Sequence, residues 1–529
     1  MKCVLALLAL AIATPATAGT SDPFSAYARA RIAEADGDAA AATHAYAEAL
    51  AGAPDDRAIA LRAYREAVRG GDMVLADRAA ATLAVHGTPP PDAALLAVAR
   101  AARAHDLPAA RAAVARLAQG HLRIFAAPLA AWIAVEAGQG DPLAALPVRS
   151  GDAVARRLTE ETRALILLAT GRTAAGLTAL RAVLGNDQAA QDNRLAAARL
   201  LIARGDGATA RTLLTGDAPA IVAVRDRPEG RGAAPSLAFG ASHLFARVAS
   251  DLALGEPGPL SFALTQAALR ADLANDRARL LLAGALAKDG ATDAALATLA
   301  AIPADSIHAR AAAAGRVQLL AEADRAQEAL AAARAVAQAP GATAADARRL
   351  ADLYLSAGDG AAAAPLYRAL IDRAGDAADA TDWLQLGAAL DRAGRWPDAR
   401  DALDRAYALA PQDPLVLNYL GYSLIEHRER MPQAQAMLER AAALRPDDAA
   451  ITDSLGWSLY LRGQPARALP LIERAAAASP GDAEIGEHLG DLYWWSGRRY
   501  EARYAWSAAR VAAQGALAER LDRKIADGL

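Results

Sequence analysis

The chain has 529 residues and a net charge of −3, and its 54% hydrophobic and 22% charged residues exclude wholesale disorder. Alanine makes up roughly 29% of the chain, and because alanine favours helices and disfavours strands, an all-β fold is excluded and a large α/β sheet is disfavoured. The balanced charge leaves no basic surplus for a nucleic-acid partner. We therefore expect an all-helical protein.

The first residues have the pattern of an export signal. Lys2 precedes an apolar run over residues 4–13, and the sequence Ala-Thr-Ala at 16–18 fits a signal-peptidase site. We expect residues 1–18 to be a signal peptide and the mature protein to be periplasmic. A buried N-terminal helix is the alternative.

The only cysteine, Cys3, would leave with this signal, so we expect a mature protein that has no disulfide and is held by packing alone. No later segment has the length of uncharged apolar sequence that a membrane-spanning helix needs. We therefore expect no integral membrane span.

The middle of the chain predicts helical repeats of declining regularity. Residues 19–140 contain degenerate repeats, as the spacing of Ala42, Tyr46 and Ala49 indicates. Residues 141–260 predict irregular helical pairs with a Gly- and Pro-rich loop near 226–235, which we interpret as a hinge or domain boundary. Residues 261–375 again predict degenerate repeats.

The last third contains a regular repeat, with four units over residues 380–513 and a capping helix over 514–529. A Leu-Gly pair recurs at spacings of 34, 35 and 34 residues, followed in phase by an alanine, a large apolar residue and a second alanine. The glycines are Gly387, Gly421, Gly456 and Gly490. The later positions are Ala399, Leu403 and Ala406; Ala434, Leu438 and Ala441; Ala468, Ile472 and Ala475; and Ala502, Trp506 and Ala509.

Each unit predicts two helices with one apolar stripe each, because its large residues are spaced by three and four. Glycine and alanine allow the two helices to approach closely, and Pro411, Pro446 and Pro480 end the first three units, since proline cannot continue a helix. No unit can bury its stripe alone, so the units must stack.

This pattern resembles the tetratricopeptide repeat family. The unit with Trp383, Leu386, Gly387, Leu390, Ala399, Leu403, Ala406 and Pro411 matches the family pattern at nearly every position. The next three units carry Leu417, Thr452 and Gly486 where the family has tryptophan. The resemblance implies a right-handed superhelical α-solenoid of antiparallel helix pairs, regular in the C-terminal part and degenerate in the N-terminal part.

The strings LNYLGYSL, ITDSLGWSLY and EHLGDLYWWSGR are similar to a group of bacterial envelope proteins with these repeats. Some members of that group act as scaffolds for partner proteins, including processing proteases. Many of them are lipoproteins, whereas this chain lacks a cysteine at the lipid-attachment position.

Signatures of catalysis or cofactor binding are missing from the sequence. None of the three lysines follows a glycine, which excludes a P-loop, and no two histidines share a helical turn as a zinc site would require. We therefore expect no catalytic residue, no cofactor and no metal. A hidden pair of catalytic carboxylates is not excluded by the sequence.

The family resemblance implies a concave groove lined by the first helix of each unit. The residues at these positions are Asn418, Tyr422, Asp453, Trp457, Tyr460, Glu487, Asp491 and Trp494. Aromatic rings beside polar groups suit a protein interface. The alternative is that the rings pack between adjacent units, as we expect for Trp383 and Trp506.

We interpret the protein as a non-catalytic periplasmic scaffold that binds a protein or peptide in this groove. Clamps for a C-terminal carboxylate carry Lys and Arg, whereas this groove carries Asn418, Asp453 and Glu487, so a neutral or basic partner with apolar anchors fits better. The alternatives are an envelope enzyme that acts on cell-wall or polysaccharide material, and a purely structural assembly component.

The export prediction can be tested directly. We expect the precursor to be cut after Ala18 and released, because the small residues at 16 and 18 suit the peptidase. N-terminal sequencing of the protein from the envelope measures the cleavage site. A retained Met1 or a lipid on Cys3 would contradict the prediction.

Overall fold

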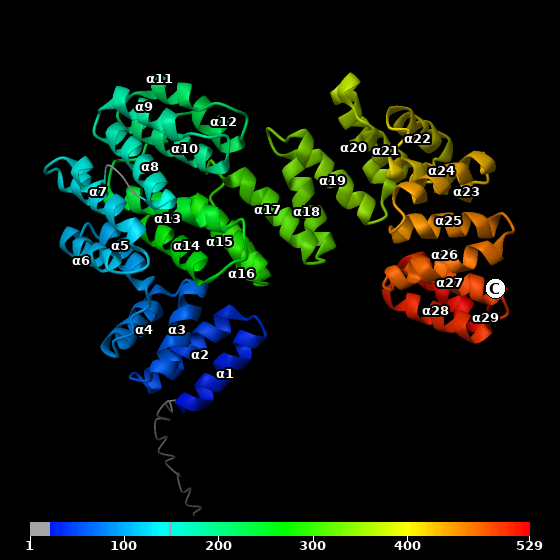
Figure 1. Ribbon diagram of the computed structural model, residues 1–529, viewed down its shortest axis with the longest axis horizontal. Helices are drawn as coiled ribbons and strands as arrows, with labels where there is room; N and C mark the ends of the chain where they lie inside the picture. Colours follow the sequence, from blue (N-terminus) through cyan, green and yellow to red (C-terminus); the bar gives the residue numbers. More distant parts are fainter. Residues whose placement is uncertain (1–21, 148–150) are drawn as a thin grey trace, which may run out of the picture. The chain divides into compact units, whose positions relative to one another are not determined.

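The computed structural model describes residues 22–147 and 151–529, and within them the chain forms 29 α-helices, three 3-10 helices and no β-strand (Figure 1). This confirms the expectation of an all-α solenoid. The chain divides into two compact units, the first ending at Asp324 and the second beginning at Arg325. The expected signal peptide, residues 1–18, lies outside the described residues.

The first unit contains helices α1 to α17. Their bounds are α1 Pro23–Ala35, α2 Ala39–Gly52, α3 Arg57–Gly70, α4 Met73–Val85, α5 Ala93–Arg103, α6 Leu107–Ala118, α7 Ala126–Ala137, α8 Ala153–Ala169, α9 Thr173–Val183, α10 Gln188–Ala203, α11 Gly207–Leu213, α12 Pro219–Asp226, α13 Leu237–Leu252, α14 Pro259–Ala271, α15 Asp276–Lys288, α16 Thr292–Ala300 and α17 Ala309–Glu322. The 3-10 helices η1 (Arg123–Phe125) and η2 (Pro142–Ala145) flank α7.

Helices α13 and α14 pack against helices that lie far away in the sequence. Helix α14 contacts α3 and α5, and α13 contacts α5, α7 and α10 (Figure 1). The fully buried Trp132 ring of α7 lies on Gly240 of α13, where a Cβ atom would be 2.2 Å from the ring. Arg270 of α14 binds Asp77 of α4, with 2.9 Å between Nη1 and Oδ1. The first unit is therefore folded back on itself, and not a simple row of helix pairs.

These contacts explain why the expected hinge or boundary within residues 141–260 is not where the chain divides. Helix α13, near the end of the irregular segment, packs against α5 and α7 before the segment and against α14 and α15 after it, so the segment is part of the first unit. The division at Asp324 and Arg325 falls within the range 261–375 that the sequence suggested as one segment.

The second unit is a row of helix pairs. Its bounds are α18 Ala326–Gln338, α19 Ala344–Ser356, α20 Gly360–Ala374, η3 Gly375–Ala377, α21 Ala380–Arg392, α22 Trp396–Leu409, α23 Pro414–Glu426, α24 Met431–Leu444, α25 Ala449–Leu461, α26 Pro465–Ala478, α27 Ala483–Trp495, α28 Arg499–Ala512 and α29 Gly515–Asp527. The four regular repeats are the pairs α21–α22, α23–α24, α25–α26 and α27–α28, and α29 packs against the last pair.

Local sequence sets where these helices begin and end. An aspartate precedes the first helix of each regular repeat, and its carboxylate accepts a hydrogen bond from a backbone amide in the first turn of that helix. Asp413, for example, accepts from the amide of Leu415 over 2.8 Å. The turns inside three repeats use a glycine with positive φ, at Gly394, Gly463 and Gly497. The second repeat has one more residue in this turn, and there Arg428 and Arg430 adopt positive φ.

A glycine of the first helix lies against a large residue of the second helix in every regular repeat. An added Cβ would lie 2.6 Å from Leu403 at Gly387, 3.0 Å from Leu438 at Gly421, 2.7 Å from Ile472 at Gly456 and 2.2 Å from Trp506 at Gly490. The four large residues are fully buried. Close approach of the two helices is thus built into the repeat, as the spacing predicted. Trp383 packs partly buried against the cluster that contains Tyr367 and Leu386.

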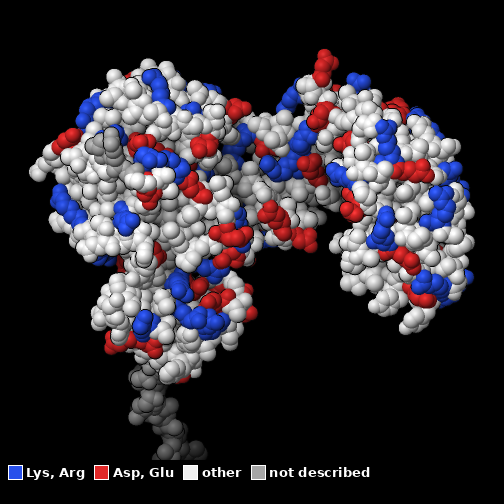
Figure 2. All heavy atoms as spheres, in the orientation of Figure 1, with Lys and Arg blue, Asp and Glu red and all other residues white. Residues whose placement is uncertain are grey.

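Charged side chains of both signs are interspersed on the face of the molecule drawn in Figure 2. Many form short-range pairs along one helix, such as Arg395 with Asp398 at 2.6 Å. Such exposed pairs contribute little to stability individually.

Gly490 provides a stability test of the glycine contact. We expect Gly490→Ala to lower the free energy of unfolding by about 1–3 kcal/mol, because the new methyl group overlaps the buried Trp506 ring. Gly481→Ala is the matched control, since nothing lies within 4 Å of its added Cβ. Denaturant unfolding measures both variants, and equal midpoints for the two would contradict the close-contact interpretation.

Candidate functional site

The eight predicted groove positions come from the first helices of three consecutive repeats, α23, α25 and α27. These helices contact one another, α23 with α25 and α25 with α27. The Tyr422 hydroxyl of α23 donates to Glu484 of α27 over 2.8 Å, and so reaches across α25. The structure therefore brings side chains of the three helices onto one face, which we call the inner face.

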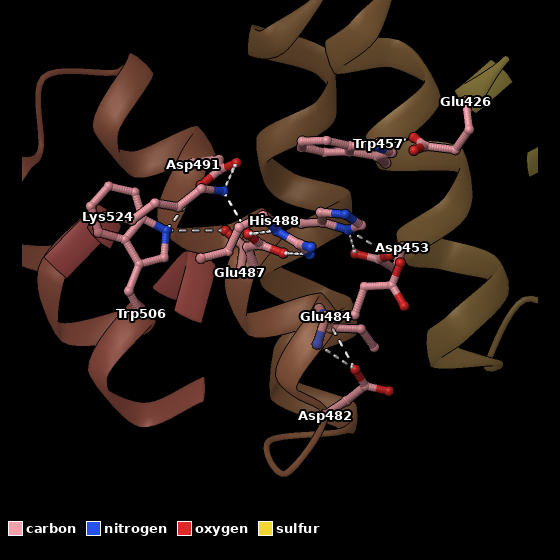
Figure 3. Close-up of polar contacts among 12 residues, drawn as sticks. Glu426, Asp453, Trp457, Asp482, Glu484, Glu487, His488, Asp491, Trp506 and Lys524 are labelled. Carbon is pink, nitrogen blue, oxygen red and sulfur yellow. Dashed lines mark hydrogen bonds and ion pairs between the residues drawn. The ribbon is translucent and has the colours of Figure 1, made fainter. Parts of the chain in front are cut away.

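An aromatic pair lies in the middle of the inner face. The Trp457 and Tyr460 rings of α25 are 5.0 Å apart, and both side chains are half-buried. Trp457 donates its indole N–H to Glu426 over 2.9 Å and stacks on His488 of the next repeat, with 3.9 Å between ring centroids (Figure 3). One face of the indole is thus used for packing between repeats.

His488 and Asp453 form a buried pair beneath this tryptophan. The His488 Nδ1 atom lies 2.9 Å from Asp453 Oδ2, and the two residues are 4% and 5% exposed (Figure 3). Burial lowers the pKa of His488, but the charge and the hydrogen bond of Asp453 outweigh this effect and raise it above its usual value. The pair therefore favours a protonated imidazole that links α25 to α27.

Glu487 and Asp491 are buried against cations of the capping helix α29. Lys524 Nζ lies 2.8 Å from Glu487 and 2.7 Å from Asp491, and Arg520 donates to both oxygens of Glu487. Burial alone would raise the pKa of Glu487, but the hydrogen bonds from Arg520 and Lys524 lower it to about 2. At Asp491 burial is the larger effect and raises the pKa despite Lys524.

Trp506 completes this cluster from α28. Its indole N–H donates to Asp491 over 2.9 Å, and its ring is fully buried (Figure 3). Trp494 is partly buried: Arg499 lies 3.9 Å from the centre of its ring, and the Trp506 ring lies 5.5 Å away. A Cβ added at Gly528 of the C-terminus would lie 2.1 Å from the Trp494 ring. Trp494 thus serves mainly to hold the capping helix.

Asn418 of α23 occupies the same position in its helix as Asp453 and Glu487 do in theirs, but its surroundings differ. It is partly buried, and its Oδ1 atom has no hydrogen-bond partner among the described residues. Of the eight predicted positions, Tyr422, Trp457, Tyr460 and Trp494 therefore have partly exposed rings, and Trp494 packs under Arg499. Asp453, Glu487 and Asp491 are buried and paired within the chain.

Sequence reasoning missed the groups that neutralise the buried acids. Arg520 and Lys524 are four residues apart on α29, and this spacing places both side chains on one face of the helix. The spacing was the sequence feature from which a cationic face of the capping helix could have been predicted. The acids that remain exposed on the inner face are instead Glu426 and Glu484, which accept hydrogen bonds from Trp457 and Tyr422. The negative charge of this face comes from them.

No group of three or more His, Cys, Asp or Glu side chains that could hold a metal ion occurs among residues 22–147 and 151–529. Across the same residues, no helix combines the length and the apolar character needed to cross a membrane.

The paired helices, the stacked repeats and the ring-lined inner face define an α-solenoid of the class that acts as a scaffold for protein–protein interaction. Residues 348–414 and 420–483 match the family profile of the tetratricopeptide repeat. These residues therefore contain tetratricopeptide repeats, as their sequence pattern indicated. A search of curated proteins finds no match.

Solved structures of repeat proteins align with parts of the chain. A tetratricopeptide repeat protein from Parabacteroides merdae is 13% identical over 47% of this chain and 96% of its own, with a TM-score of 0.41. A thermophilic tetratricopeptide repeat protein from Thermus thermophilus is 21% identical over 35% and 98%, with a TM-score of 0.31. MamA from Desulfovibrio magneticus is 20% identical over 33% and 97%, with a TM-score of 0.27.

The buried histidine pair predicts a pH-dependent contribution to stability. Because the pKa of His488 is raised in the folded state, its pairing with Asp453 stabilises the fold fully below pH 6.5, and this stabilisation is lost as the pH rises through the folded-state pKa. We expect Asp453→Asn to lower the free energy of unfolding by about 1.5–3 kcal/mol at pH 6 and by less at pH 9.

Asp391→Asn is the matched control for this measurement. Asp391 pairs with His427 at 3.0 Å, and Trp396 stacks on that histidine at 4.0 Å, but the imidazole is exposed. Urea unfolding at both pH values measures the difference from wild type. A loss of stability in Asp453→Asn that is the same at pH 6 and pH 9 would contradict the assignment of a protonated His488.

Proposed function

We propose that the protein is a non-catalytic periplasmic scaffold that binds a segment of another protein on the inner face of α23, α25 and α27. The observation that supports the proposal is the row of partly exposed rings, Tyr422, Trp457 and Tyr460, on one face of three contacting helices. Aromatic side chains at such positions supply large apolar area together with a polar edge, and they dominate the binding energy of protein interfaces.

The inner face is rigid enough to act as a preformed surface. The polar edges of Tyr422 and Trp457 are fixed by Glu484 and Glu426, and the repeats beneath them are joined by the buried Asp453–His488 pair. Binding of a partner would cost little side-chain entropy, because these hydrogen bonds already fix the positions of the rings.

The charge of the inner face favours a neutral or basic segment. Glu426 and Glu484 are exposed beside the rings, whereas the acids deeper in the face are matched by Arg520, Lys524 and His488. A partner carboxylate would be repelled, and a lysine or arginine that flanks an apolar anchor would be attracted. The proposed periplasmic location is supported by the signal pattern of residues 1–18.

Selection of peptides tests the site. A displayed peptide library is selected on the full-length protein, and the affinity of the selected peptides is measured for variants. We expect Trp457→Ala to weaken binding about 30-fold or more, because loss of a central interface ring costs about 2 kcal/mol or more. Tyr504→Ala is the control, since Tyr504 is an exposed ring on α28 outside the inner face.

Circular dichroism separates binding from folding in the same variants. If Trp457→Ala unfolds the protein, the ring is structural and the proposal loses its main support. If the variant stays folded and binds the peptides as wild type does, the binding surface lies elsewhere.

Glu426→Gln tests the charge preference separately, because the amide oxygen can still accept from Trp457. We expect weaker binding of basic peptides at low salt and a smaller difference from wild type at high salt, as screening removes the attraction. Equal affinities at low salt would contradict the charge argument.

A further inference from the structure

A cavity of about 270 Å³ lies in the first unit, within the irregular region of the sequence. Its walls come from α10, α12, α13 and the start of α15, and from the connections around residues 230, 272–275 and 303–308. The Gly- and Pro-rich stretch that interrupts the repeat pattern is therefore part of the wall of a cavity. None of the inner-face residues contributes to it.

Two arginines of this cavity have no acidic partner. Arg199 of α10 donates through Nε to the backbone carbonyl of Arg231 over 3.3 Å, which places the two residues side by side. Both line the cavity, and no carboxylate of the described residues forms an ion pair with either guanidinium. Burial lowers the pKa of Arg199, and the charges of Asp272 and Asp276 do not restore it.

A third arginine supports the same interpretation. Arg247 of α13 lines the cavity, is 2% exposed, and pairs with Asp251 through Nη1 and with Glu161 through Nε at 3.5 Å. Its Nη2 atom, however, has no hydrogen-bond partner among the described residues. A buried donor without a partner costs free energy, so a bound acceptor would be favoured here.

Four aspartates also line the cavity, and none of them forms an ion pair with Arg199 or Arg231 among the described residues. Asp192 is paired with Arg277 at 3.1 Å, and Asp276 is paired with Arg279. Asp272 accepts from the amide of Ala274 in its own turn, and its charge raises the pKa of Arg199 without outweighing the effect of burial. Asp305 is exposed at the rim.

The remaining walls are neutral or apolar. Burial lowers the pKa of His243 and of His308 to about 4, so both imidazoles are uncharged at neutral pH. Leu195, Val224 and Phe239 add apolar surface. Most ligand sites have this composition, with apolar walls and a few directed polar groups.

We propose that this cavity binds a small molecule whose carboxylate or phosphate group is held by Arg199 and Arg231, with its apolar part against Leu195, Val224 and Phe239. Both arginines line the cavity, and the N–H donors of a guanidinium group match the oxygens of a carboxylate or a phosphate. The site is independent of the proposed protein-binding face.

The test uses three probes with the full-length protein: benzoate, inorganic phosphate, and benzamide as the uncharged analogue of benzoate. Calorimetric titration measures the affinities, and thermal unfolding provides a second readout. We expect benzoate or phosphate to bind and to raise the melting temperature, and benzamide to do neither. Tighter binding of benzoate than of phosphate identifies a carboxylate with an apolar body, and the reverse identifies a phosphate.

Variants connect binding to the two arginines. We expect Arg199→Gln and Arg231→Gln each to weaken binding of the preferred anion by about tenfold to a hundredfold, as expected for loss of a charge-assisted hydrogen bond. Arg194→Gln on the same helix is the control, since Arg194 does not line the cavity. Arg231 lies in a connection between helices, so its variant remains informative if Arg199→Gln impairs folding.

Three results would overturn the proposal. One is that neither anion binds the wild-type protein. Another is that benzamide binds as well as benzoate, which would leave only an apolar cavity. The last is that the affinity for the anion is unchanged in Arg231→Gln and in Arg199→Gln.

Discussion

The regular part of the structure depends on the contact between a glycine of one helix and a large side chain of its partner. At Gly490 the missing side chain makes room for the Trp506 ring, which is fully buried. The position of that ring brings its indole N–H to Asp491, and Asp491 in turn holds Lys524 of the capping helix. One absent methyl group thus determines how the last repeat is closed, and a solenoid needs such closure because its final apolar stripe has no further repeat to cover it.

The repeat array could be predicted from the sequence because its determinants are local and periodic. The Leu-Gly pairs, the in-phase alanines and the terminal prolines fix two helices and one close contact within each unit of 34 or 35 residues. The packing of α13 and α14 against α3, α5 and α7 could not be predicted in this way. It joins segments that share no repeat register, and a pattern along the chain contains no information about which distant helix fills a given gap.

The inner face shows the same limit for single residues. Helical phase placed Asp453, Glu487 and Tyr422 on one side, and the structure has them there. The position of a residue in its helix does not reveal, however, which side chain of another helix it contacts. Asp453 pairs with His488 of the next repeat, and Glu487 pairs with Arg520 and Lys524 of the capping helix. Buried charges persist only when they are paired, so a polar residue at a groove position can equally well be part of the joint between repeats.

The two units therefore use polar residues in opposite ways. In the regular repeats every buried acid of the inner face has a cation or a hydrogen-bond donor as its partner, and what remains accessible is aromatic surface flanked by Glu426 and Glu484. In the first unit the repeat pattern is interrupted between α12 and α13, and there Arg199 and Arg231 line a cavity without an acidic partner. A strict repeat leaves little room for such unmatched groups, because each position must pack in every copy. An interruption of the pattern removes this constraint, and for that reason the irregular segment is where a solenoid can accommodate a small-molecule site.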